Sequence, residues 1–208
     1  MRRTALLFTA ITVLLIAPGC LPAPTGPATL IIGDSNTIGT AWGRPASWAE
    51  QLSCSPDVWA WGGTGITRSG YTGGGPITLT ADLDTIMNGR TGDHVAVMLG
   101  TNDALGRTSL PTVAQLNTLT DRIIATGAAS VRWITIPPLR ADVSATTRAR
   151  RDTLNTRITQ TANHLDSSGA FGGAATLPPN MAADSLHLNQ NGHATLGYHM
   201  AVNTNLCG

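Results

Sequence analysis

The chain of 208 residues has a net charge of +1, with 42% hydrophobic and 12% charged residues. This length favours one domain with a substantial core. The balanced charge, the complete lack of lysine and the scattered arginines argue against a nucleic-acid partner. Abundant glycine, threonine and alanine with only 4% aromatic residues indicate a loop-rich globular protein, not a coiled coil or a disordered tail.

Residues 1–23 have the pattern of an export signal and the start of a linker, followed by a single domain at 24–208. Two arginines precede the apolar run Ala5–Ala17, which is too short for a comfortable membrane span. The tail of the run resembles a bacterial lipobox, so lipidation of Cys20 and cleavage near Ala23 both stay open. We expect a secreted or cell-envelope-attached monomer, which would contact the membrane only if Cys20 carries a lipid anchor.

Export would leave Cys54 and Cys207 as an even pair of cysteines in an oxidising compartment. We predict that they form a disulfide, which would tie the C-terminus to the end of the first large helix. Two buried free thiols are the alternative.

Expected strands and helices alternate along the chain. Apolar runs favour strands at 29–32, 57–61, 94–99 and 131–136, and helical spacing favours helices at 45–52, 79–87, 113–125, 146–165 and 191–203. The arginines of 146–165 are interpreted as a solvated face. The glycine-rich stretch 62–76 is a predicted loop, and 166–183 has no clear pattern. The alternation predicts an α/β fold, a three-layer α/β/α sandwich with a parallel sheet of about five strands.

Functional sites in such sheets lie at the carboxyl ends of the strands. Four polar blocks fall there in the predicted topology: Gly33-Asp34-Ser35-Asn36, the glycines between 62 and 65, Gly100-Thr101-Asn102-Asp103, and Asp184-Ser185-Leu186-His187. An Asp-Ser pair after a strand is by itself more often a turn or a helix cap than a nucleophile. The other three blocks therefore decide how Ser35 is interpreted.

The four blocks resemble those of the SGNH hydrolases, the GDSL-like esterase and lipase superfamily, from about Thr29 to Gly197. GTND and DSLHLNQNGH are the specific parts of this resemblance. It implies a flavodoxin-like fold and a serine esterase that works through an acyl-enzyme without a cofactor. Ser35 would be the nucleophile and His187 the base, with Asp184 or a backbone carbonyl orienting the histidine.

The resemblance also implies an oxyanion hole made by the backbone N–H groups of Ser35 and Gly65 and the side-chain amide of Asn102. Gly62 and Gly63 are rivals to Gly65, because Ala60 and Ile66 replace an asparagine and an acid that are usual in the family. Two further expectations concern neighbours of these residues. Asn36 stands where leucine is usual and is expected to shape the pocket wall, and the aspartates of the first and third blocks, Asp34 and Asp103, are expected to brace local backbone.

The small domain, which has no obvious long lid, favours short acyl or acetyl esters as substrates, on small molecules or on polysaccharides. The alternatives are an O-acetyltransferase acting on cell-envelope glycans and an envelope-binding domain with little turnover. Trp42 and Trp61 either line the substrate cleft or pack in the core or at its rim, whereas the other tryptophans are expected in the core. His193 and His199 on the final predicted helix are interpreted as structural or exposed, and His94 and His164 fall at element boundaries. None of these four histidines has metal-ligand spacing with an acid or a cysteine.

Overall fold

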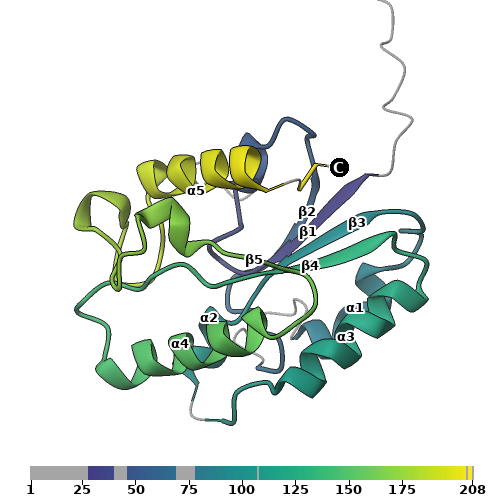
Figure 1. The fold of residues 1–208 in the computed structure, drawn as a ribbon, viewed down its shortest axis with the longest axis horizontal. Coiled ribbons are helices and arrows are strands. Elements are labelled where there is room, and N and C mark those ends of the chain that lie inside the picture. The colour runs from purple at the N-terminus through teal and green to yellow at the C-terminus, as the bar shows by residue number, and fades with distance from the viewer. Residues whose placement is uncertain (1–27, 40–45, 69–77, 107, 205, 208) are drawn as a thin grey trace, which may run out of the picture.

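The computed structural model describes residues 28–39, 46–68, 78–106, 108–204 and 206–207 (Figure 1). The export signal with Cys20, and also Trp42, lie outside these residues. No helix in the described part of the chain is both long enough and apolar enough to span a membrane.

Five parallel strands form the central sheet, in the order β2-β1-β3-β4-β5. Their bounds are β1 Thr29–Gly33, β2 Asp57–Ala60, β3 His94–Met98, β4 Ser130–Ile134 and β5 His164–Leu165. The α-helices are α1 Leu79–Ile86, α2 Thr101–Leu105, α3 Val113–Ala125, α4 Ala145–Thr159 and α5 Gln190–Asn203. Short 3-10 helices occur at Ala49–Gln51, Ser168–Phe171 and Pro179–Met181. The predicted α/β class with a five-stranded parallel sheet is confirmed.

Helices cover both faces of the sheet, which gives three layers (Figure 1). Alternate residues of the strands point to opposite faces, so Leu30 and Ile32 join the core with α1, α3 and α4, while Ile31 joins the core with α5. Because both faces are covered, β1 is buried along its whole length. This is why its sequence is a continuous apolar run instead of an alternating one.

Four helices begin at a side-chain cap that the sequence provides, and one of them is α4, where the Ser144 hydroxyl accepts from the N–H of Thr147. Thr78, Thr112 and Asn189 each accept a hydrogen bond from a backbone N–H three residues later, and Thr112 forms a full capping box with Gln115. The predicted helices at 79–87, 113–125 and 191–203 therefore lie within one residue of the observed bounds.

Two predicted helices were wrong in extent. The first, at 45–52, is only the 3-10 helix Ala49–Gln51 where the structure describes it. The second, at 146–165, ends at Thr159, and His164–Leu165 instead form β5, which pairs with Trp133 and Ile134 of β4. A two-residue edge strand is too short to leave a periodic pattern in the sequence.

The solvated-face interpretation of the arginines in α4 was also wrong. Arg151 is 6% exposed, and its guanidinium donates to the carbonyl of Ala175 at 3.1 Å. Arg150 donates to carbonyls of Ala104 in α2 and of Thr108 just after it, and Arg157 donates to the carbonyls of Leu110 and Pro111 before α3. These side chains hold loops on to α4, because a guanidinium presents several donors in a fixed geometry.

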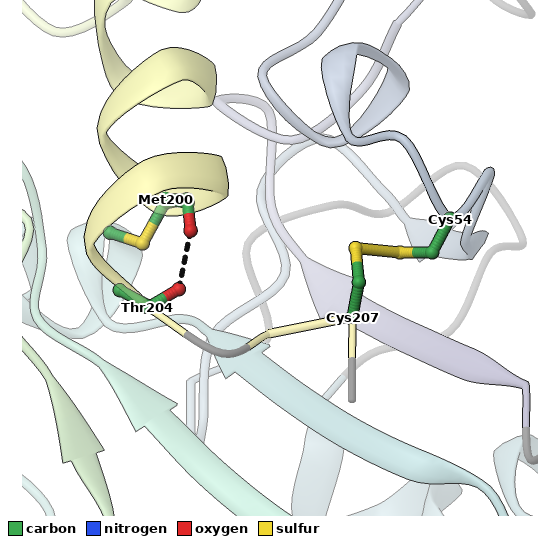
Figure 2. The surroundings of a disulfide bond; sticks show 4 residues. All are labelled: Cys54, Met200, Thr204 and Cys207. Atoms are coloured by element: carbon green, nitrogen blue, oxygen red, sulfur yellow. Dashed lines mark hydrogen bonds between the residues drawn. A yellow bond between two sulfur atoms is a disulfide. The ribbon is translucent and has the colours of Figure 1, made fainter.

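Cys54 and Cys207 form a disulfide, with their Cα atoms 5.5 Å apart (Figure 2). The bond links residues 153 positions apart and ties the segment after α5 to the loop before β2. The predicted pairing is thus present in the structure, although Cys54 follows a 3-10 turn and not a large helix. Closing so long a loop restricts the unfolded chain, which is the main stabilising effect of a disulfide in the chain-entropy model.

Candidate active site

The carboxyl end of β1 presents Ser35 at a tight turn. The strand ends at Gly33, and the N–H groups of Thr37 and Ile38 donate to the carbonyl of Asp34 at 2.9 and 3.2 Å. The turn leaves the Ser35 side chain partly exposed at the edge of the sheet, between fully buried neighbours. No described residue accepts a hydrogen bond from the Ser35 N–H. This donor is therefore available to a bound group.

Ser35 lies at one end of a three-residue relay. Its Oγ is 2.9 Å from Nε2 of His187, and Nδ1 of His187 is 2.7 Å from Oδ2 of Asp184. An ionised carboxylate can only accept, so Nδ1 carries the proton that faces Asp184. The lone pair on Nε2 then accepts from the Ser35 hydroxyl. In this tautomer the histidine is oriented as a general base.

Asp184 is held in the ionised form that this relay needs. Partial burial acts to raise the pKa of Asp184, but hydrogen bonds from the His187 side chain and from two backbone N–H groups outweigh it and lower the pKa below its usual value. Those N–H groups belong to Leu186 and His187 and lie 2.7 and 2.8 Å from Oδ1. One oxygen thus shapes the loop while the other orients the ring. The side chains of Asp184 and His187 are 57% and 27% exposed, so the relay opens to solvent.

Two ionisable side chains are buried next to the relay. Burial raises the pKa of Asp34 to about 6, although its hydrogen bond with the Asn36 N–H acts in the opposite direction. Burial lowers the pKa of His193 on α5 to about 4. The expected local brace by Asp34 is present as its 2.9 Å hydrogen bond with the Asn36 N–H.

Asn102 is carried by α2, a short helix where the sequence indicated only a loop. The chain enters α2 through Gly100, whose φ of 127° is unfavourable for residues with a side chain. A Cβ atom there would also lie 2.6 Å from Leu154. Arg68 and Arg150 donate to carbonyls of α2 at 2.6 and 2.9 Å, which fixes the helix against its neighbours.

Asp103 braces the glycine-rich loop that faces Asn102. Its carboxylate accepts from the N–H groups of Ile66, Thr67 and Arg68 at 2.7, 3.0 and 3.2 Å, and also from the Thr67 hydroxyl. A brace was expected here, but on local backbone, whereas these partners lie more than 30 positions away. Only glycine fits at position 65 in this arrangement, because a Cβ atom there would lie 2.5 Å from the Asp103 carboxylate.

The orientation of the peptide between Thr64 and Gly65 decides whether the Gly65 N–H can take part in the predicted oxyanion hole. Its carbonyl accepts from Nδ2 of Asn102 at 2.9 Å, and its N–H donates to the carbonyl of Arg68 at 3.1 Å. The C=O and N–H of a trans peptide point in opposite directions, so the Gly65 N–H points away from the Asn102 amide. This orientation differs from the sequence expectation for Gly65. The N–H groups of Gly62 and Gly63 donate to no other described residue.

Asn36 does more than the sequence indicated. It is 3% exposed and so does not form a pocket wall. Its side-chain amide contacts backbone on both sides of His187, at Leu186 and Leu188. No local sequence pattern predicts this contact, because the partners lie about 150 positions away in the chain.

The remaining candidate residues are placed as follows. Trp61 follows β2 and is partly buried, which suits either a cleft or a rim position. Trp48 and Trp133 are fully buried, and Trp59 packs against the core. Within the described residues, no group of three histidine, cysteine, aspartate or glutamate side chains is placed to hold a metal ion.

A Ser-His-Asp relay at the carboxyl edge of a parallel α/β sheet is an arrangement typical of serine hydrolases. Residues 31–195 match the GDSL-like Lipase/Acylhydrolase family, and the chain belongs to that family. A comparison with curated protein sequences gave no significant match.

Solved structures with the same fold are distant in sequence. A provisionally named arylesterase from Agrobacterium tumefaciens shares 19% identity with a TM-score of 0.63, covering 85% of this chain and 97% of that one. An acetylxylan esterase from Geobacillus stearothermophilus shares 18% identity with a TM-score of 0.62, covering 87% and 96%. A carbohydrate acetylesterase from Sinorhizobium meliloti shares 16% identity with a TM-score of 0.61, covering 85% and 97%. At these identities the likeness concerns the fold alone.

Proposed function

We propose that this acylhydrolase is an exported serine esterase that removes short acyl groups, acetyl above all, from carbohydrate or small-molecule alcohols. The observation that carries the proposal is the relay from Asp184 through His187 to Ser35, with heavy-atom distances of 2.7 and 2.9 Å. These distances lie within the range that proton transfer between the groups requires.

In the proposed reaction, Oγ of Ser35 attacks the ester carbonyl carbon while its proton passes to Nε2 of His187. The bond from that carbon to the alcohol oxygen then breaks, and the same proton leaves with the alcohol. Water then attacks the acyl carbon while one of its protons passes to Nε2 of His187. The bond between that carbon and Oγ of Ser35 breaks, His187 returns the proton to Oγ, and the carboxylic acid leaves. Asp184 stays ionised throughout and stabilises the positively charged ring that forms twice in the cycle.

The developing oxyanion would be held by the Ser35 N–H, the second N–H of the Asn102 amide, and a glycine N–H from the loop after β2. We assign the last donor to Gly62 or Gly63, because the Gly65 N–H is bonded to Arg68. A donor of this kind contributes about 10²–10³ in kcat to related reactions. The brace by Asp103 and the two arginines around α2 keeps these donors fixed before substrate binds.

The preference for short acyl groups on large alcohols rests on two supports. The relay is open to solvent, with His187 27% exposed, so a bulky alcohol can remain outside while the acyl group reaches Ser35. Two structural neighbours are named as an acetylxylan esterase and a carbohydrate acetylesterase. The proposed extracellular setting is supported by the N-terminal sequence and by the disulfide.

A series of p-nitrophenyl esters from acetate to palmitate, assayed beside acetylated xylan, tests the substrate class. We expect kcat/KM to be highest for acetate and to fall as the acyl chain lengthens, with acetate released from the polysaccharide. The Ser35→Ala variant supplies the blank for uncatalysed hydrolysis. An optimum at octanoate or longer would contradict the short-acyl proposal, and faster transfer to a glycan acceptor than to water would make the protein an acetyltransferase.

A further inference from the structure

Asn36 comes directly after Ser35 and is buried at the base of the same turn. It is 3% exposed, and its own N–H donates to Oδ1 of Asp34 at 2.9 Å. The backbone of Asn36 is therefore fixed relative to Ser35. Its side chain extends from this fixed point towards the loop that carries His187.

The side-chain amide of Asn36 brackets the backbone of His187. Nδ2 donates to the carbonyl of Leu186 at 3.2 Å, and Oδ1 accepts from the N–H of Leu188 at 3.0 Å. One partner precedes His187 and the other follows it. An amide is suited to this task because it offers a donor and an acceptor side by side.

Other hydrogen bonds shape the His187 loop from within or attach it elsewhere. Asp184 accepts from two N–H groups of its own loop, and the N–H of Arg140 donates to the carbonyl of Ser185 at 3.2 Å. Among described residues, only three hydrogen bonds join the turn at 34–36 to the stretch 186–188. One is the Ser35–His187 bond itself, and the other two come from Asn36.

We propose that Asn36 is a positioning residue that sets the distance and orientation of His187 relative to Ser35. The inference rests on the proposed function and adds to it a residue that acts through the base. The turn that delivers the nucleophile also holds the base, so a movement of one segment carries the other with it. A displacement of about 1 Å in such a pair can cost about 10²-fold in rate.

Two variants of Asn36 separate its two hydrogen bonds. Asn36→Leu keeps a similar volume and removes both, while Asn36→Asp keeps the acceptor for Leu188 and sets an oxygen against the Leu186 carbonyl. We expect Asn36→Leu to lower kcat for p-nitrophenyl acetate by about 10–100-fold with KM little changed, and Asn36→Asp to fall between Asn36→Leu and wild type. All assays run well below each variant's Tm, so that the folded fraction is complete.

Asn155 provides the matched control. Like Asn36, it uses its side-chain amide once as an acceptor and once as a donor to backbone. It accepts from the N–H of Ile136 at 2.8 Å and donates to the carbonyl of the same residue at 2.9 Å. It lies on α4, and both of its side-chain hydrogen bonds join it to Ile136, which is not a residue of the relay. Asn155→Leu should lower Tm as Asn36→Leu does, but leave kcat unchanged.

The outcomes separate this inference from the proposed function. If both Asn36 variants fold and keep the wild-type kcat while Ser35→Ala is inactive, the positioning role is wrong and the esterase stands. If Asn155→Leu loses as much kcat as Asn36→Leu, the effect is general destabilisation and the positioning role is also wrong. If the wild-type protein hydrolyses no ester, the proposed function fails, and the inference fails with it. Should Asn36→Leu not fold, the kcat of Asn36→Asp decides.

Discussion

The described residues include two hydrogen-bonded serine–histidine pairs, which lie at opposite ends of the sheet. Ser35 and His187 lie at the carboxyl edge with an Oγ–Nε2 distance of 2.9 Å. Ser130 and His94 open β4 and β3, pair across the two strands, and have an Oγ–Nδ1 distance of 2.8 Å. By distance alone, the second pair is as good a nucleophile and base as the first.

The surroundings of the two pairs differ in what they add. His187 has Asp184 on its other ring nitrogen, whereas no described carboxylate bonds to His94, and the neighbouring Asp93 lies 3.7 Å from Arg90 instead. The Ser35 N–H, which could donate to an oxyanion, has no acceptor among the described residues. A serine–histidine contact becomes a candidate catalytic pair only with an orienting acid and free oxyanion donors.

The largest expected difference between the pairs is kinetic. Ser35→Ala should lower kcat/KM for p-nitrophenyl acetate by about 10⁵–10⁶-fold, since loss of a nucleophile in a comparable relay has an effect of that size. Ser130→Ala removes the same hydroxyl from the other pair and should leave kcat/KM unchanged. Steady-state assays of both variants, with circular dichroism to show that each is folded, test this. Equal losses in the two variants would remove the distinction between the pairs.

A smaller expected difference concerns pH and stability. Two groups with oppositely shifted pKa values lie near the Ser35–His187 pair: burial raises the pKa of Asp34 to about 6 and lowers the pKa of His193 to about 4. Between pH 4 and 6 the folded protein keeps a proton on Asp34 that the unfolded chain has lost, so this group's contribution to stability falls as pH rises. Over the same range the unfolded chain binds a proton at His193 that the folded protein lacks, so its contribution rises with pH.

The two contributions should nearly cancel in the wild-type protein. Each single variant should show the contribution of the group that is left. In His193→Gln the free energy of unfolding should fall by about 2 kcal/mol from pH 4 to 6, and in Asp34→Asn it should rise by a similar amount. The pKa values of Asp184 and Asp166 are lowered below their usual value, so both act mainly below this range. Urea unfolding at pH 4, 5 and 6 measures the slopes. If the free energy of unfolding changed with pH in both variants as it does in wild type, burial of Asp34 and His193 would not shift their pKa values as described.

Much of the fold could be predicted because its elements have strong local patterns. The apolar run of β1 and the capped periodic helix α3 are visible in the sequence. The two-residue strand β5 and the five-residue helix α2 were missed because neither is long enough for its periodic pattern to repeat. The arginines of α4 were misjudged because their partners are backbone carbonyls. Every residue has such a carbonyl, so the sequence does not indicate which of them an arginine will contact.

The candidate site could be predicted where a role depends on the type of residue, and much less where it depends on the conformation of the backbone. Ser35, Asn102, Asp184 and His187 stand in recognisable blocks, and the structure brings the three relay residues into hydrogen-bond contact. The direction of the Gly65 N–H depends on how one peptide is turned, which composition does not record. The contact between Asn36 and the His187 loop joins residues 150 positions apart, and no local pattern encodes it.

Labelling with a fluorophosphonate tests the central claim most directly, because this reagent reacts with a serine that a neighbouring base and oxyanion donors activate. The native protein is treated, digested, and analysed by peptide mass spectrometry. We expect the label on Ser35 and none on Ser130, with labelling lost in His187→Ala and retained in His94→Ala. A label on Ser130, or undiminished labelling of Ser35 in His187→Ala, would contradict the account.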